Sequence, residues 1–244
     1  MPTFRRIALA AAAAPLALVL AACGDSADEG APTGEPIAPI AAPNDTSWVE
    51  TAAVTPEGGY VIGNPDAPLK LVEYASHTCS HCAAFSQEGA AELDEYVAKG
   101  IVSYEIRNQI HDALDMTIAL LARCGSPQAF HPLANQAWGG FNQVMENAQP
   151  ALQAAAQAPE AQRFQTIAEV SGLLDFFAAR GISRDQALIC LADTAKVEQI
   201  YEASQTQSDE LGITGTPTFI LNGRKIEGTD WASVETALQN AGAR

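Results

Sequence analysis

The chain has 244 residues, of which 48% are apolar and 17% are charged, and its formal net charge is −16 at pH 7. This length and composition suit one globular domain with an elaboration, or two small domains, and allow a proper hydrophobic core. Because a strongly acidic surface repels phosphate groups, the charge excludes nucleic acid as a partner and disfavours direct binding to anionic membranes.

The first 22 residues have the features of an export signal. Arg5 and Arg6 give it a positively charged start, and the apolar run that follows is too short and too small-sided for a membrane-spanning helix. We therefore predict a cleaved signal peptide over residues 1–22. Leu20–Cys23 resembles the lipobox of bacterial lipoprotein signals, in which the cysteine is lipidated, whereas an ordinary signal with an incidental cysteine is the alternative.

Residues 23–57 are predicted to form a flexible tether. Four prolines lie among glycine, alanine and acidic residues between positions 24 and 46, and this composition buries too little apolar surface to fold. With a lipid on Cys23, the tether would hold the protein at the periplasmic face of a bacterial membrane. As a flexible coil it would reach about 25 to 30 Å from that surface.

Three segments have strand patterns in the first half of the globular region. Tyr60–Ile62 is short, Leu69–Ala75 is a largely apolar run typical of a central strand covered on both faces, and Val102–Arg107 alternates. Between the last two, three- and four-residue spacing of apolar residues from Cys79 to Gly100 predicts an amphipathic helix. These elements form a β-α-β unit.

After His111 the pattern is helical, and strand signals return only near the C-terminus. Thr218–Leu221 and Arg224–Ile226 are joined by Asn222–Gly223, which is a strong hairpin signal, and a helix over Asp230–Ala241 follows. The sequence therefore predicts an α/β fold with an inserted all-helical subdomain. The predicted parts are 58–111 for the N-terminal part of the α/β domain, 112–193 for the helical insertion, and 194–244 for the C-terminal part.

The cysteines of an exported chain must be assigned before other chemistry is considered. Cys23 belongs to the predicted lipidation site, and Cys79 and Cys82 form a CxxC motif. Cys124 and Cys190 remain, one near each end of the helical insertion. In an oxidising compartment we expect them to form a structural disulfide, and two buried free thiols are the alternative.

The motif Cys79–Ser80–His81–Cys82 lies at the start of a predicted helix. Free backbone N–H groups and the positive end of the helix dipole would stabilise a thiolate on Cys79, which is the species that attacks disulfides. Cys82 lies one turn along the same face and can close or resolve the disulfide. His81 can add a positive charge or a hydrogen bond.

A plain structural disulfide and a metal site are the alternatives for this motif. A zinc site needs a second ligand pair beside Cys79, Cys82 and a nearby histidine, and His111 and His131 do not repeat the spacing. We therefore expect neither metal nor cofactor. The combination of a strand, a CxxC motif at a helix start and a late Thr-Pro pair favours redox chemistry.

Two segments resemble the DsbA group of bacterial thiol-disulfide interchange proteins, namely Leu71–Phe85 around the CxxC motif and Gly212–Phe219. The resemblance spans about residues 58–244 and includes the helical insertion. It implies a thioredoxin-like fold, with Cys79 as the exposed nucleophile, Cys82 as the buried resolving cysteine and Pro217 as a cis-proline facing the disulfide. A cis bond there would expose the backbone of Thr216 to an extended substrate.

Glu73 lies inside the apolar strand segment, on the face of Leu69 and Leu71. An ionised carboxylate is costly there unless it is paired or its pKa is raised, so we expect a buried acid; a strand-edge glutamate that reaches water is the alternative. The resembling family has an acid at this place, six residues before the first cysteine. A role in passing protons to and from Cys82 follows as a hypothesis.

The resemblance leads us to expect a protein-disulfide oxidoreductase of the bacterial envelope that donates the Cys79–Cys82 disulfide to unfolded or reduced exported proteins. It also implies re-oxidation by a quinone-linked membrane partner. Ser80 stands where the best-known oxidases of the family have proline, so the redox potential cannot be inherited. The alternatives are a reductase or isomerase for a narrow client set, and a non-catalytic peptide-binding or chaperone lipoprotein.

Overall fold

The computed structural model describes Met1 and residues 33–44 and 46–244. The predicted signal peptide, apart from its first residue, and the predicted lipidation site at Cys23 lie outside the described residues. Within the described part of the chain, no helix has both the length and the apolar character that a bilayer crossing requires.

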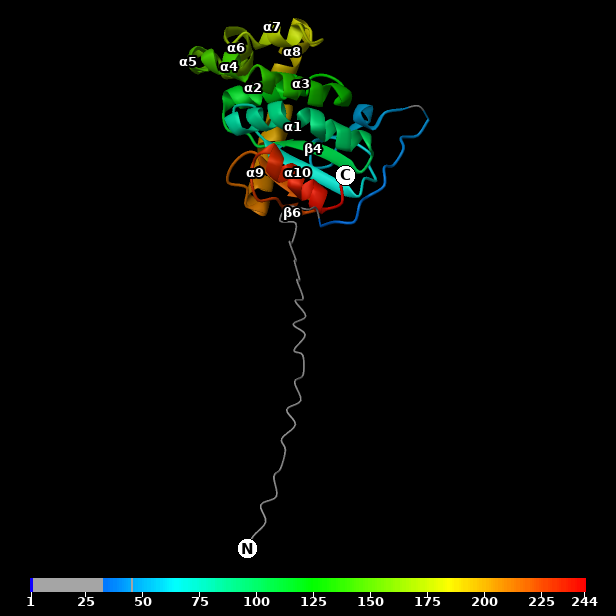
Figure 1. Cartoon of the computed structure of the whole chain (residues 1–244). Helices are drawn as coiled ribbons and strands as arrows, with labels where there is room; N and C mark the ends of the chain where they lie inside the picture. Colours follow the sequence, from blue (N-terminus) through cyan, green and yellow to red (C-terminus); the bar gives the residue numbers. More distant parts are fainter. Residues whose placement is uncertain (2–32, 45) are drawn as a thin grey trace. The chain divides into compact units, whose positions relative to one another are not determined.

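A mixed β-sheet forms the centre of the folded region (Figure 1). Its strands are β1 (Ala52–Val54), β2 (Tyr60–Gly63), β3 (Leu69–Ala75), β4 (Val102–Asn108), β5 (Thr218–Leu221) and β6 (Arg224–Lys225). The order across the sheet is β1-β2-β4-β3-β5-β6, with β3 and β4 parallel and the other neighbouring pairs antiparallel. Central strand β3 is largely buried, which explains its nearly continuous run of apolar residues.

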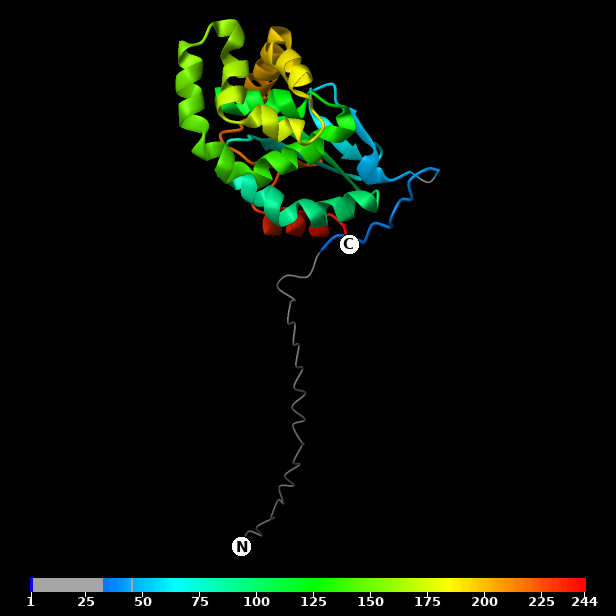
Figure 2. The ribbon, with the colours of Figure 1, turned by 90° about the horizontal axis from the view of Figure 1, so that it is seen from above.

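Helices cover both faces of this sheet. Helices α1 (Ser80–Ala98) and α10 (Trp231–Asn240) lie side by side, as Figure 2 shows. Helix α9 (Thr194–Leu211) packs on the other face, where Gln207 accepts a hydrogen bond from the Tyr74 hydroxyl at 3.1 Å. Because side chains alternate along a strand, Glu73 points away from α9 and towards α1.

The helical insertion lies between β4 and α9 and confirms the predicted α/β fold with an inserted helical subdomain. Ser183 begins the last of its helices by accepting a hydrogen bond from the backbone N–H of Gln186 at 3.3 Å. The helices of the insertion are α2 (Ala113–Ala122), α3 (Pro127–Gly139), α4 (Phe141–Glu146), α5 (Ala148–Gln157), α6 (Arg163–Val170), α7 (Leu173–Ala178) and α8 (Arg184–Leu191).

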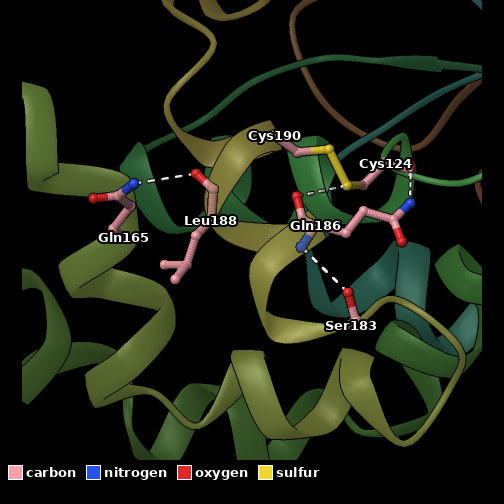
Figure 3. The surroundings of a disulfide bond; sticks show 6 residues. All are labelled: Cys124, Gln165, Ser183, Gln186, Leu188 and Cys190. Atoms are coloured by element: carbon pink, nitrogen blue, oxygen red, sulfur yellow. Dashed lines mark hydrogen bonds between the residues drawn. A yellow bond between two sulfur atoms is a disulfide. The ribbon is translucent and has the colours of Figure 1, made fainter.

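A disulfide joins Cys124, just after α2, to Cys190 in α8 (Figure 3). Beside the disulfide, the Gln186 side chain donates a hydrogen bond to the Cys124 carbonyl at 2.8 Å. The Gln165 side chain of α6 donates to the Leu188 carbonyl at 3.1 Å. The bridge therefore connects the first and last helices of the insertion.

The N-terminal boundary differs from the prediction of a tether up to residue 57. A short 3-10 helix at Trp48–Glu50 and strand β1 lie inside that range. Trp48 is only 8% exposed, and its indole Nε1 donates to the Ile40 carbonyl at 2.7 Å. The Ile40 N–H in turn donates to the carbonyl of Lys99 at the end of α1, at 2.8 Å. The folded part thus begins before residue 58. The sequence did not indicate this boundary, because the isolated apolar residues of the segment contact the domain separately and form no periodic pattern.

Candidate active site

The CxxC motif lies where β3 passes into α1. Cys79 is the N-cap residue, with extended backbone angles, and α1 begins at Ser80. Cys79 is partly exposed and Cys82 is fully buried, and both are free thiols. Ser80 and His81 lie at the surface of the first turn. One cysteine of the pair is therefore accessible and the other is not.

The surroundings of Cys79 stabilise its thiolate. A hydrogen bond from the Cys82 thiol, one from the Thr216 hydroxyl, and backbone N–H groups of Cys82 and His81 lower the pKa of Cys79 to about 5, against the opposing effect of partial burial. The helix start supplies these backbone donors because the first N–H groups of a helix have no partner within it. His81 acts here through its backbone, and no described residue offers its side chain a hydrogen-bond partner.

Cys82 has the opposite environment. Burial, the hydrogen bond that it donates to Cys79, and Glu73 and Cys79 in their ionised forms raise the pKa of Cys82 well above the usual range. The two cysteines thus differ in accessibility and in the ease with which each loses its proton.

The loop at Thr216–Pro217, just before β5, faces Cys79. The peptide bond between these residues is cis. The Cys79 thiol lies 3.2 Å from the Thr216 carbonyl oxygen, to which it donates in the protonated form. Beside this contact is a groove of about 420 Å³, lined by the residues of 214–218 and 225–229. Thr216 therefore both lines this groove and contacts the Cys79 thiol.

Glu73 lies beneath the motif and is 1% exposed. Its Oε2 accepts a hydrogen bond from the Tyr104 hydroxyl, while Oε1 has no hydrogen-bond partner among the described residues. Burial raises the pKa of Glu73 to about 8, with a smaller upward contribution from Cys79 and an opposing one from the Tyr104 hydrogen bond. The carboxyl group is thus protonated at neutral pH and lies close enough to Cys82 to influence its pKa.

Four residues near the motif were not predicted as site residues from the sequence, namely Tyr104, Asp115, His111 and Trp138. Tyr104 pairs with Glu73, and the Trp138 indole donates to the Ser76 carbonyl at 3.0 Å. His111 Nε2 lies 3.3 Å from the Thr216 hydroxyl oxygen. A buried Asp115 within the apolar run Ala113–Ala122 is a sequence signal of the same kind as Glu73.

Two further histidines are part of the core. His131 Nε2 hydrogen-bonds the Tyr60 carbonyl at 2.8 Å, and burial lowers the pKa of His131 to about 4. His77 stacks on the ring of Trp138, with ring centroids 4.9 Å apart. In the described chain, no three His, Cys, Asp or Glu side chains are grouped in a way that could hold a metal ion.

A family model described as thioredoxin matches residues 55–240. The chain belongs to the thioredoxin family. This places the CxxC motif, the helix that follows it and the cis-proline loop within one thioredoxin-like domain, and the predicted thioredoxin-like fold is confirmed.

Relatives of this thioredoxin-family chain are named as protein-disulfide oxidoreductases. It is 25% identical over 193 residues to a "Putative protein-disulfide oxidoreductase" of Rickettsia bellii, covering 76% of this chain and 65% of that protein. A protein of the same name from Rickettsia felis is 25% identical over 182 residues, covering 74% and 59%. The chain therefore spans less than two thirds of the length of these relatives.

Solved structures share the fold. A protein-disulfide isomerase from Novosphingobium aromaticivorans has 32% identity and a TM-score of 0.69, over 74% of this chain and 95% of that one. Wolbachia pipientis α-DsbA1 has 19% identity and a TM-score of 0.60, over 75% and 89%. The second likeness concerns the fold alone, whereas the first extends to the sequence.

Proposed function

We propose that this chain is a thiol-disulfide oxidoreductase that passes its Cys79–Cys82 disulfide to exported proteins through a mixed disulfide. The contrast between the two cysteines carries the proposal: Cys79 is accessible with a pKa of about 5, and Cys82 is buried with a raised pKa. Whatever stabilises the thiolate stabilises the reduced enzyme, and this makes the disulfide more oxidising. The names of the relatives agree with disulfide chemistry.

In the proposed reaction, a substrate thiolate attacks the Cys79 sulfur of the enzyme disulfide. The S–S bond breaks, a mixed disulfide forms on Cys79, and the electron pair goes to Cys82. Glu73, protonated at neutral pH, gives its proton to the Cys82 thiolate. A second substrate thiolate then attacks the substrate sulfur, and Cys79 leaves as a stable thiolate. The substrate ends oxidised, with a disulfide, and the enzyme ends reduced.

The groove beside Thr216 and Pro217 is the proposed substrate-binding site. Thr216 lines the groove and contacts the Cys79 thiol, an arrangement that suits an extended peptide whose cysteine forms the mixed disulfide. Backbone pairing with such a peptide requires little side-chain recognition, so this site suits many unfolded clients. We propose that a quinone-linked membrane protein re-oxidises the reduced enzyme. The proposed lipid on Cys23 would hold the enzyme at the periplasmic face of the membrane.

The test is the reduction potential of the Cys79–Cys82 couple, measured by equilibration with glutathione. A potential near −120 mV, the value typical of a strong oxidant of this fold, supports donation of the disulfide, whereas a potential near about −270 mV contradicts it. A matched pair of variants tests the residue roles. Cys79→Ser must abolish exchange. Cys82→Ser must accumulate a mixed disulfide when its Cys79 thiolate attacks a disulfide-bonded peptide and displaces one peptide sulfur as a thiolate, because the enzyme has no second thiol to release the bound peptide.

One observation favours isomerase chemistry as a second candidate. The solved structure that is 32% identical to this chain is named a protein-disulfide isomerase. Refolding of a client with scrambled disulfides distinguishes the two activities, because an isomerase restores native pairing starting from its reduced form. A peptide-binding protein without redox activity would keep its function in Cys79→Ser.

A further inference from the structure

Asp115 is a fully buried carboxylate in the first turn of α2, at 0% exposure. A charge in this position is costly unless hydrogen bonds replace its hydration. Three donors meet it: the Ser76 hydroxyl at 2.6 Å, the His77 N–H at 2.8 Å and the His111 N–H at 3.0 Å. Both carboxylate oxygens are used as acceptors, and His77 Nδ1 lies a further 3.6 Å from Oδ1.

The first two donors belong to the segment that leads from β3 into the nucleophile. Ser76 and His77 follow β3 and are separated only by Thr78 from Cys79, the N-cap of α1. The Trp138 indole holds the same segment from α3 through the Ser76 carbonyl, at 3.0 Å. The position of the Cys79 sulfur is therefore fixed from the helical insertion as well as from its own helix.

The third donor residue, His111, connects Asp115 to Thr216, which also contacts the Cys79 sulfur. His111 is exposed, and its Nε2 lies 3.3 Å from the Thr216 hydroxyl oxygen. The Thr216 hydroxyl is one of the groups that lower the pKa of Cys79. A hydroxyl has a single proton, so when Thr216 donates it to the thiolate, its oxygen is free to accept the N–H of His111. Asp115 holds the backbone of the residue that supplies that N–H.

We propose that Asp115 is a positioning residue for the Cys79 thiolate, which it aligns by joining the Ser76–His77 segment to His111 and, through His111, to the Thr216 hydroxyl. The proposal rests on Cys79 being the nucleophile of the proposed function. It assigns to the helical insertion a direct part in setting the reactivity of the thioredoxin-like domain, since α2 carries the carboxylate.

Asp115→Asn is the sharpest test, because the amide keeps the shape but has one acceptor oxygen. If that oxygen faces the His77 N–H, the amide nitrogen can donate to the Ser76 hydroxyl but opposes the His111 N–H. In this orientation the variant releases His111 and leaves the segment before Cys79 in place. We expect the pKa of Cys79, followed by thiolate absorbance, to rise by about one unit. The equilibrium constant for oxidation of glutathione by the Cys79–Cys82 disulfide then falls about tenfold. This corresponds to a reduction potential that is lower by about 30 mV.

Thr117→Val is the matched control for a general loosening of α2. Thr117 is fully buried on the same helix, and its hydroxyl donates to the Ala113 carbonyl within that helix at 2.7 Å. We expect it to lower the melting temperature without changing the Cys79 titration. An equal pKa shift in this variant would overturn the proposal, as would an Asp115→Asn protein that folds and titrates like the wild type.

His111→Ala carries the test if Asp115→Asn does not fold, because His111 is exposed. Its expected effect is the same upward pKa shift, with recovery in His111→Gln, which keeps a side-chain N–H. In the double variant of Asp115→Asn and His111→Ala the two pKa shifts should not add, since both act through one contact. Full additivity contradicts the proposal.

The failure of the proposed function can be told from the failure of this proposal. If the wild-type protein does not exchange disulfides, the proposed function is refuted. If the wild-type protein is active and the variants titrate like it, only the role of Asp115 is refuted.

Discussion

Cys79 and Cys82 are three residues apart on one helix, and their pKa values move in opposite directions. The first thiol faces the unpaired N–H groups of the helix start and the Thr216 hydroxyl, and the second faces the apolar core. The hydrogen bond between them links the two effects, because Cys82 stabilises the Cys79 thiolate by keeping its own proton. In such a pair, Cys79 is the better leaving group and Cys82 is a buried thiol that keeps its proton.

The contribution of Cys82 can be isolated with two substitutions of similar size. Cys82→Ala removes the thiol that donates to Cys79, which is the largest of the causes that lower its pKa. Cys82→Ser keeps an O–H donor at the same place. We expect the pKa of Cys79 to rise clearly in the alanine variant and less in the serine variant, as followed by thiolate absorbance against pH. Equal titrations in the two variants would contradict this account.

Glu73 predicts a pH dependence of stability. Its pKa is about 8 in the native protein, against an ordinary value of 4.5. Below pH 4.5 the carboxyl is protonated in both states; between 4.5 and about 8 the unfolded chain loses the proton and the native protein keeps it. The native protein therefore binds more protons, and the free energy of unfolding falls with rising pH, by about 1.4 kcal/mol per unit at most.

Glu73→Gln removes this titration while keeping the shape of the side chain. Relative to the wild type, the variant should gain stability steadily between pH 4.5 and about 8 and no further above it. Denaturant unfolding of both reduced proteins across this range measures the difference, in which the contributions of other titrating groups largely cancel. A constant difference with pH would show that Glu73 is ionised in the native protein.

At the scale of elements, α1 is positioned by its contact with α10. Gly89 lies in the middle of α1, where glycine costs about 1 kcal/mol of helix propensity. A Cβ at this position would lie 2.6 Å from ring atoms of Trp231 on α10. The glycine therefore permits a close approach of the two helices on the face of the sheet that covers Glu73.

Gly89→Ala is expected to destabilise the protein by about 1 to 3 kcal/mol, because the overlap with Trp231 outweighs the gain in helix propensity. Gly139→Ala is the control: it lies at the end of α3, and its added Cβ would meet nothing within 4 Å. The denaturant midpoint of Gly89→Ala should fall, whereas the midpoint of Gly139→Ala should rise or stay unchanged. Stabilisation by Gly89→Ala would rule out steric overlap with Trp231.

At the scale of the whole molecule, the residues before β2 form part of the folded domain. Trp48 is buried against it, and the Ile37 N–H donates to the carbonyl of Gly242 near the C-terminus at 2.9 Å. The N-terminal segment therefore connects α1, the edge of the sheet and the C-terminal end of the chain. A membrane tether of the proposed kind would end well before residue 48.

Trp48→Ala should lower the free energy of unfolding by about 3 kcal/mol or more, which is typical for removal of a buried aromatic side chain. Val54→Ala is the control within the same segment, since Val54 on β1 is 52% exposed and its truncation should cost little. Denaturant unfolding of the two variants measures the difference. A small effect of Trp48→Ala would mean that the segment detaches without cost and behaves as the predicted tether.

Local patterns determined much of this protein. Strand β3, the CxxC motif at the start of α1, the hairpin at Asn222–Gly223 and the helical insertion follow from hydrophobic periodicity, helix caps and turn residues. These signals span only a few neighbouring residues, so they can be recognised without knowledge of the fold. The burial of Glu73 belongs to the same group, because an acid on the inward face of an apolar strand is buried together with its neighbours.

Other features depended on the tertiary structure. Tyr104 meets Glu73 because β3 and β4 are parallel neighbours, and His111 meets Thr216 across 105 residues of sequence. Trp48 is buried by residues that no local pattern connects to it. Asp115 accepts two of its three hydrogen bonds from Ser76 and His77, which are distant in the chain. The sequence by itself thus determined which residue types carry the proposed redox chemistry. Only the long-range packing of strands and helices decided which polar groups surround the sulfur, because these contacts join segments that are distant in the chain.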